Sequence, residues 1–131
     1  MTDKDTLGCG CMSASRAAAL NTLVLAYVGD AVWSLLVRTK LAESCDCKAG
    51  ELHKLASATV NAGAQARLAE AVLDKLTDEE RDVFMRGRNA KAHHKAKNQS
   101  GADYRKATAM EAVVGYLYLS GNVARIVELL S

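Results

Sequence analysis

Apolar residues recur at three- and four-residue steps along most of the chain, which is the spacing of one face of an α-helix. The first such run covers residues 15–42, and Ser13 or Ser15 is available as its N-cap. A second run covers residues 49–75, with a break expected near Asn61–Gly63. The pattern therefore predicts long helical segments in the first half of the chain.

The second half contains shorter helical patterns on either side of a polar segment. Thr77 and Glu80 have the spacing of a capping box, which begins a helix that reaches about residue 86. Residues 88–101 lack apolar periodicity and end in Asn-Gln-Ser-Gly, which is typical of a loop. Further helices are expected over residues 103–120 and over a short segment at the end of the chain.

The composition favours an all-α fold. Half of the 131 residues are apolar, proline is absent, and only 5% are aromatic. A chain of this length supports one compact core. We expect a flexible N-terminal tail over residues 1–14 and a single domain, a helical bundle, over residues 15–131.

The start of the chain is polar and acidic, unlike the basic and then apolar start of a signal peptide. No apolar run of membrane-spanning length is free of charge. The sequence therefore predicts a soluble cytoplasmic protein with no membrane partner.

The four cysteines form two Cys-x-Cys pairs, Cys9 with Cys11 and Cys45 with Cys47. Four thiolates can hold zinc, and paired cysteines can form disulfides. Neither pair has the usual Cys-x-x-Cys spacing, and we interpret all four as reduced thiols without a function. The alternative is a zinc or redox protein that uses these thiols.

Two acids interrupt helical runs that are otherwise apolar. Asp30 follows Gly29 in the sequence LAYVGDAV, and Glu111 is the only acid of MEAVVGY, which also contains Gly115. A carboxylate withdrawn from water requires a cation, a proton or hydrogen bonds. Glycines allow two helices to cross closely, which would bring the two acids together. A shared Mg²⁺ would relieve their repulsion, whereas the alternative is a structural ion pair of each acid with an Arg or Lys.

Positive charge is concentrated between residues 86 and 106. This segment has seven Lys and Arg residues against the single acid Asp103, in a chain whose formal net charge is +2. Such an excess favours an anionic partner, and the alternative is a solvated loop. His93 and His94 have no zinc-site spacing, and we interpret them as neutral loop residues.

Three blocks in this order are specific when taken together: LNTLVLAYVGDAVW at 20–33, RGRNAK at 86–91 and YRKATAMEAVVGYLYL at 104–119. In these blocks the chain resembles the ribonuclease III family, and in particular its Mini-III subfamily, which has a catalytic domain without a double-stranded-RNA-binding domain. The resemblance implies a ribonuclease III-like helical bundle that forms a homodimer and cleaves double-stranded RNA. Candidates for the dimer surface, which would suit a core equally well, are Tyr27, Val32, Trp33 and Leu36.

The resemblance also implies the site. Asp30 and Glu111 match the family's catalytic acids and would both bind Mg²⁺, with Mn²⁺ as an expected substitute. Two further acids of ordinary ribonuclease III enzymes are replaced by Ala26 and Thr108, and Thr108 is a candidate additional ligand of metal or water. Cleavage would leave 5′-phosphate and 3′-hydroxyl ends. Because only two acids remain, the alternative is a catalytically weakened dimer that binds double-stranded RNA.

RNA contacts are expected from the basic segment, because duplex RNA is recognised mainly through its shape, phosphates and 2′-hydroxyls. The candidates are Arg86, Arg88, Asn89, Lys91, Lys95, Lys97 and Arg105. From the resemblance alone, we expect the substrate to be the 23S ribosomal RNA precursor, in ribosomal RNA processing and ribosome biogenesis, with a ribosomal protein as a candidate helper.

Overall fold

The structure, a computed structural model, describes residues 7–90 and 101–131. Within these ranges there is no strand, and the prediction of an all-α fold is confirmed. The elements are α2 (Ala14–Ala18), α3 (Thr22–Ser44), α4 (Ala49–Thr59), α5 (Ala62–Val72), the 3₁₀ turn η1 (Leu73–Lys75), α6 (Asp78–Asn89), α7 (Gly101–Leu119) and α8 (Val123–Leu130).

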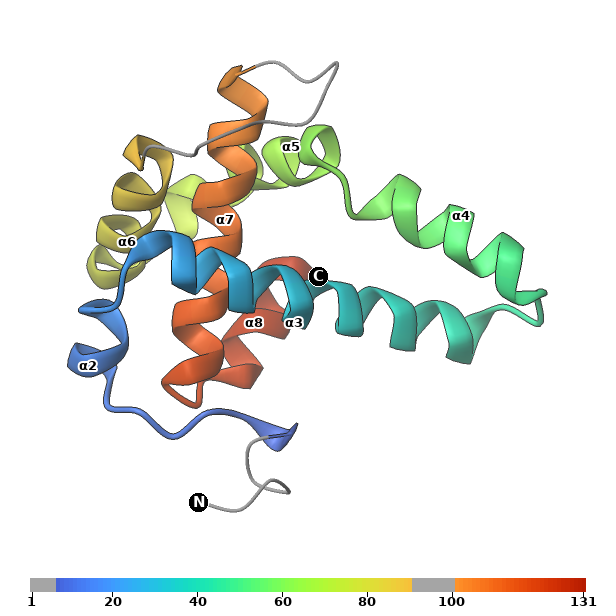
Figure 1. The fold of residues 1–131 in the computed structure, drawn as a ribbon, viewed down its shortest axis with the longest axis horizontal. Helices are drawn as coiled ribbons and strands as arrows, with labels where there is room; N and C mark the ends of the chain where they lie inside the picture. The colour runs from blue at the N-terminus through green and yellow to red at the C-terminus, as the bar shows by residue number, and fades with distance from the viewer. Residues whose placement is uncertain (1–6, 91–100) are drawn as a thin grey trace.

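The crossing of α3 and α7 is the main contact of the bundle (Figure 1). Helices α5, α6 and α8 pack around α7, while α4 folds back beside the second half of α3, so that the two form an arm that extends from the bundle (Figure 1). By length and hydropathy alone α3 would also suit a membrane span, a property that the core helices of other proteins share. Here its buried residues pack against α7.

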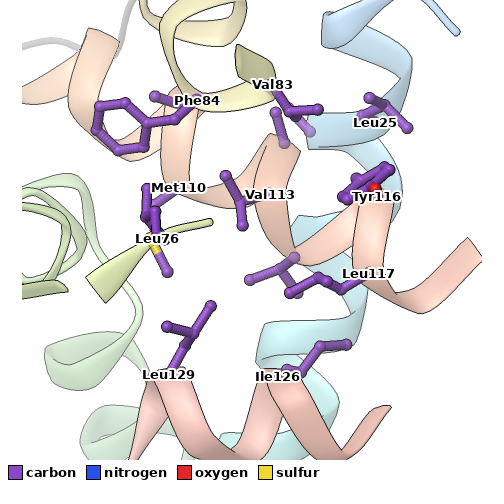
Figure 2. Packing of buried hydrophobic residues seen from close by; sticks show 14 of the residues in the cluster. Leu25, Leu76, Val83, Phe84, Met110, Val113, Tyr116, Leu117, Ile126 and Leu129 are labelled. Carbon is purple, nitrogen blue, oxygen red and sulfur yellow. The ribbon is translucent and has the colours of Figure 1, made fainter. Parts of the chain in front are cut away.

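The hydrophobic core surrounds α7. From Ala107 to Leu117 every residue of this helix is buried except Glu111. Met110 and Val113 pack with Leu25 of α3 and Val83 of α6, and all four side chains are fully enclosed (Figure 2). A helix that is apolar on all sides belongs in a core, so the one charged residue in the middle of α7 requires an explanation.

The first predicted helix, over residues 15–42, is in fact two helices, and that prediction is wrong. Helix α2 ends at Ala18, and α3 begins after Asn21, whose side-chain oxygen accepts a hydrogen bond from the backbone N–H of Leu23 at 2.8 Å. Asparagine is a favoured N-cap because it satisfies such a free N–H. The cap of α2 is Ser13, one of the two serines proposed.

Two other predicted helix boundaries are confirmed. Asn61 separates α4 from α5, and its side-chain oxygen accepts from the backbone N–H of Ala64 at 2.9 Å. Thr77 and Glu80 form the capping box, with hydrogen bonds of 3.2 and 2.9 Å. Helix α6 then continues to Asn89, beyond the expected end near residue 86.

The backbone before α2 is attached to the end of α7. The N–H groups of Gly10 and Met12 donate to the carbonyls of Tyr118 and Leu119, both at 2.9 Å. These contacts begin before residue 15, at which the domain was expected to start, whereas residues 1–6 lie outside the described ranges.

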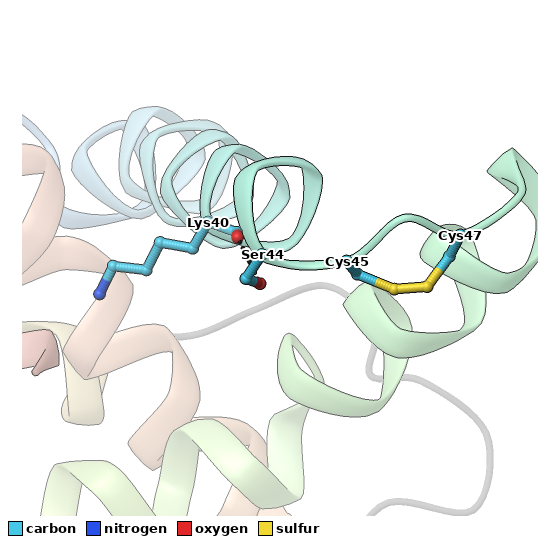
Figure 3. The surroundings of a disulfide bond; sticks show 4 residues. All are labelled: Lys40, Ser44, Cys45 and Cys47. Carbon is cyan, nitrogen blue, oxygen red and sulfur yellow. Dashed lines mark hydrogen bonds between the residues drawn. A yellow bond between two sulfur atoms is a disulfide. The ribbon is translucent and has the colours of Figure 1, made fainter.

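A disulfide joins Cys45 and Cys47 in the turn between α3 and α4 (Figure 3). Their Cα atoms are 5.3 Å apart. The prediction of reduced thiols is therefore wrong for this pair, whereas Cys9 and Cys11 are free thiols. Across residues 7–90 and 101–131 no group of three or more His, Cys, Asp or Glu side chains could hold a metal.

Candidate active site

Two glycines allow α3 and α7 to touch backbone to backbone. A Cβ atom placed on Gly29 would lie 1.7 Å from the carbonyl oxygen of Glu111, and one on Gly115 would lie 1.9 Å from that of Leu25. Backbone atoms cannot move aside as a flexible side chain can, so a larger residue at either position would force the helices apart. The predicted close approach is confirmed.

This crossing brings the carboxyl groups of Asp30 and Glu111 within hydrogen-bonding reach of each other. Burial raises the pKa of Glu111, and the neighbouring Asp30 raises it further, to about 9. Among the described residues, no ion pair includes either acid. The alternative of a structural ion pair with Arg or Lys is therefore not what the fold supplies.

The two acids differ in exposure. Asp30 is exposed, whereas Glu111 is half-buried in the centre of the molecule. The site thus has one carboxylate that a large substrate can approach and one that is held rigidly by the core helix.

Gln65 is the residue of this site that the sequence analysis missed. It lies on α5, is only 4% exposed, and its amide nitrogen donates to Glu111 Oε2 at 3.5 Å. This hydrogen bond lowers the pKa of Glu111, against the larger effects of burial and Asp30. A neutral amide in an alanine-rich helix gives no local signal, and only the packing of α5 against α7 identifies it.

The donor set fits a divalent cation. At neutral pH a carboxyl group with a pKa of about 9 holds a proton, and a cation bound by both acids would take the place of that proton. Mg²⁺ takes oxygen ligands, is commonly bound through one or two carboxylates and keeps several waters. Asp30 and Glu111 are the residues that would hold it.

Thr108 lies one turn before Glu111 on α7 and is buried. Its hydroxyl donates to the backbone carbonyl of Tyr104 at 3.0 Å. The hydroxyl oxygen keeps its lone pairs, so Thr108 stays a candidate additional ligand.

Arg86, a predicted RNA contact, has a structural role in the fold. Its guanidinium donates to the carbonyls of Ala18 at 2.7 Å and Leu20 at 3.1 Å, and it lies 3.7 Å from a carboxylate oxygen of Asp82. Ala18 is the last residue of α2 and Leu20 follows it, so these carbonyls have no partner within a helix. Arg86 therefore connects α6 to the end of α2 and to the segment before α3, and its contact with RNA stays a prediction.

The other described candidates are exposed. Arg88 and Asn89 end α6, and Arg105 lies in α7. A Cβ atom on Gly87 would lie 3.0 Å from the Cα atom of Ala109, so the end of α6 packs against the half of α7 that carries Arg105. Lys91, Lys95 and Lys97, together with His93 and His94, lie outside the described residues.

The candidates for a dimer surface separate into two groups. Trp33 belongs to the core, and Val32 packs against it. Tyr27 is 81% exposed, and Val24 and Leu35 on the same helix are also exposed. These three side chains leave an apolar stripe on the outer face of α3.

Comparison with known proteins gives one consistent result. Residues 23–122 match the model of the Ribonuclease III domain. A Mini-ribonuclease 3 of Brevibacillus brevis is 49% identical over 83% of this chain and 81% of its own length, and one of Staphylococcus aureus is 45% identical over 86% and 85%. A crystal structure of a Fusobacterium nucleatum protein superposes with a TM-score of 0.79 at 28% identity, covering 86% of this chain and 89% of that one.

Proposed function

The chain belongs to the ribonuclease III family and is an endoribonuclease, and on this premise we propose that it cuts double-stranded RNA at Asp30 and Glu111 with Mg²⁺ bound between them. The family acts on double-stranded RNA and generally uses a divalent metal. The observation that carries the proposal is the meeting of two carboxylates at the glycine crossing, where no Lys or Arg of residues 7–90 and 101–131 forms an ion pair with them.

Each residue of the site has a role that follows from its position. Exposed Asp30 meets the RNA backbone, while Glu111 is held by α7 and by the amide of Gln65. When bound, Mg²⁺ would lower the pKa of the attacking water and neutralise charge on the scissile phosphate. Mn²⁺ is expected to replace it, and the products are expected to carry 5′-phosphate and 3′-hydroxyl ends.

The proposal includes a homodimer that cuts both strands. The exposed apolar stripe of Val24, Tyr27 and Leu35 supports it, because a large exposed apolar patch marks an interaction surface. By resemblance, the RNA is the 23S ribosomal RNA precursor, with a ribosomal protein as helper, and the location is the cytoplasm. Arg88, Asn89, Lys91, Lys95, Lys97 and Arg105 are the proposed RNA contacts.

The test is cleavage of a defined RNA duplex by the purified protein, in Mg²⁺ and in EDTA. Wild type should cut only with the metal, and Asp30→Asn and Glu111→Gln should each lose at least about a hundredfold in rate, since each removes half of the donor set. Asp74→Asn, at an exposed acid of η1 far along the chain from both, is the matched control and should cut normally.

Two results would contradict the proposal. Equal cleavage by wild type and by both acid variants would separate the activity from this site. Duplex binding without any cleavage in Mg²⁺ would instead favour the weakened RNA-binding dimer.

A further inference from the structure

A small polar pocket lies beside Asp30, in the angle between α3 and α4. Its volume is about 120 Å³, and it is lined by Asp30, Ser34, Arg38, Ala56, Ser57 and Val60. The first three residues follow one another at steps of four along α3 and therefore share one face of that helix. The pocket thus extends the site from the catalytic acid toward the arm.

The pocket is built for one small anionic group. Its volume is well below the roughly 300 Å³ at which pockets begin to hold drug-sized ligands. Arg38 provides a guanidinium, which binds phosphate through paired hydrogen bonds, and Ser34 and Ser57 add hydroxyl donors. Within residues 7–90 and 101–131, no ion pair uses the charge of Arg38.

The position of Arg38 on α3 agrees with this reading, and the same residue also lines a second pocket farther along the arm. Long side chains on a helix lean toward its N-terminus, which on α3 is the direction of Asp30. Arg38 is exposed, so a strand of RNA has access to it. An arginine two turns from a catalytic acid on the same face is positioned to hold the backbone that the acid acts on.

We propose that this pocket binds the phosphodiester next to the scissile one, with Arg38 as the main donor and Ser34 and Ser57 as supporting donors. The inference rests on the proposed function, because it requires an RNA strand at Asp30. The crossing of α3 and α7 separates the arm from the end of α6, where Arg88 and Asn89 lie (Figure 1). The strand is therefore held on both sides of the cut, and Arg38 determines which phosphate enters the site.

The test compares Arg38→Gln with Lys40→Gln, a matched loss of one positive charge two residues further along α3 and outside this pocket. KM and kcat are measured on a defined duplex, together with a series of duplexes that each carry one neutral methylphosphonate near the cut. Cleavage by wild type should be slowed when the methylphosphonate replaces one phosphate adjacent to the scissile phosphate. Arg38→Gln should raise KM roughly tenfold, which corresponds to the loss of one charge-assisted hydrogen bond. The methylphosphonate at that one position should no longer slow this variant, whereas its effects at the other positions should stay as in wild type.

Arg38→Lys should recover part of the affinity, because the charge returns without the paired geometry. Thermal melting of all variants checks that the fold is intact. If Arg38→Gln behaves like Lys40→Gln, or keeps the wild-type methylphosphonate pattern, the inference is overturned while cleavage at Asp30 stands. If wild type cuts no duplex, the proposed function fails and this inference fails with it.

Discussion

Two glutamates of this small core lie in opposite surroundings. Glu80 on α6 is only 3% exposed, and the guanidinium of Arg125 donates two hydrogen bonds to its carboxylate, both at 2.9 Å. Burial alone would raise the pKa of Glu80, but the hydrogen bonds from Arg125 and Thr77 and the charge of Arg125 lower it below its ordinary value. Glu111 faces a second acid, and its pKa is raised to about 9.

The difference separates an acid that is paired within the fold from the acid that is proposed to bind metal. The fold supplies a counter-charge to Glu80 and so keeps it ionised as part of the connection between α6 and α8. Among the residues that the structure describes, none supplies a counter-charge to Glu111, which can therefore bind a proton or an external cation. A buried acid with a strongly perturbed pKa is a candidate functional residue.

The largest effect is expected from Gly29→Ala, because this change moves Glu111 away from Asp30. The new Cβ atom would lie 1.7 Å from the Glu111 carbonyl oxygen, so α3 and α7 must separate. The free energy of unfolding should fall by about 3 kcal/mol, measured by urea denaturation, and cleavage should be lost.

Gly50→Ala is its control, because no atom lies within 4 Å of the added Cβ at this helical glycine of α4. That change should be neutral or stabilise the protein by up to about 1 kcal/mol. If Gly29→Ala had the same free energy of unfolding as wild type, that result would contradict the backbone contact between the two helices.

Next in size is Arg125→Gln, which makes the surroundings of Glu80 resemble those of Glu111. A buried carboxylate then loses its partner, and the free energy of unfolding should fall by about 2 kcal/mol at pH 7. The lowered pKa of Glu80 stabilises the fold fully above about pH 4.5 and progressively less below it. The difference in unfolding free energy between Arg125→Gln and wild type should therefore shrink as the pH falls below that value.

Denaturation of Arg125→Gln over a range of pH measures this effect. Arg67→Gln, at an exposed arginine of α5, removes the same charge and should change stability little. A difference from wild type that stays constant down to pH 3 would show that Arg125 acts through packing rather than through Glu80.

An effect of similar size and opposite sign is expected from Glu111→Gln in the metal-free protein. The raised pKa means that the folded wild type keeps a proton that the unfolded chain releases above about 4.5, so its stability should fall as the pH rises from there to about 9. Glu111→Gln should lack this slope and be more stable than wild type by about 2 kcal/mol at pH 8.

Thermal melting in EDTA and in Mg²⁺ tests this prediction. Added Mg²⁺ should stabilise wild type and leave Glu111→Gln unchanged, because ligand binding to the folded state raises stability. A flat profile for wild type between pH 5 and 9 would contradict the shared site of Asp30 and Glu111.

The smallest effect is expected from Gln65→Ala, which removes the hydrogen bond that Glu111 receives from the Gln65 amide. Stability should fall by about 1 kcal/mol, and kcat should fall roughly fivefold with KM nearly unchanged, since Gln65 orients an acid without touching RNA. Steady-state kinetics measures the two parameters. An unchanged kcat would show that the core alone positions Glu111.

Local signals predicted much of the fold. Asn61 and the Thr77–Glu80 capping box were identified correctly because a cap bonds to backbone within three residues of itself. The division between α2 and α3 was missed although Asn21 carries the same signal, since apolar periodicity continues across it. The disulfide of Cys45 with Cys47 was missed because its formation depends on the path of the turn.

Charge was less predictable than helix. The basic segment has a uniform positive charge in sequence. In the structure, however, Arg86 donates hydrogen bonds to the carbonyls of Ala18 and Leu20, and Lys106 forms an ion pair with Glu70. Ala18 and Leu20 lie far from Arg86 along the chain, and Glu70 lies far from Lys106. A charge count cannot separate such residues from those that stay available to RNA.

The sequence alone predicts most of the helices, the caps at Asn61 and Thr77 and the pair of acids, because each depends on spacings of three or four residues or on motifs that resemble a family. The packing of the helices determines that Arg125 pairs with Glu80, that Gln65 donates to Glu111, and that no Lys or Arg in the described part of the chain forms an ion pair with Glu111. The physical reason is that counter-charges and hydrogen-bond partners come from other helices, and which faces meet is set by how closely those helices cross.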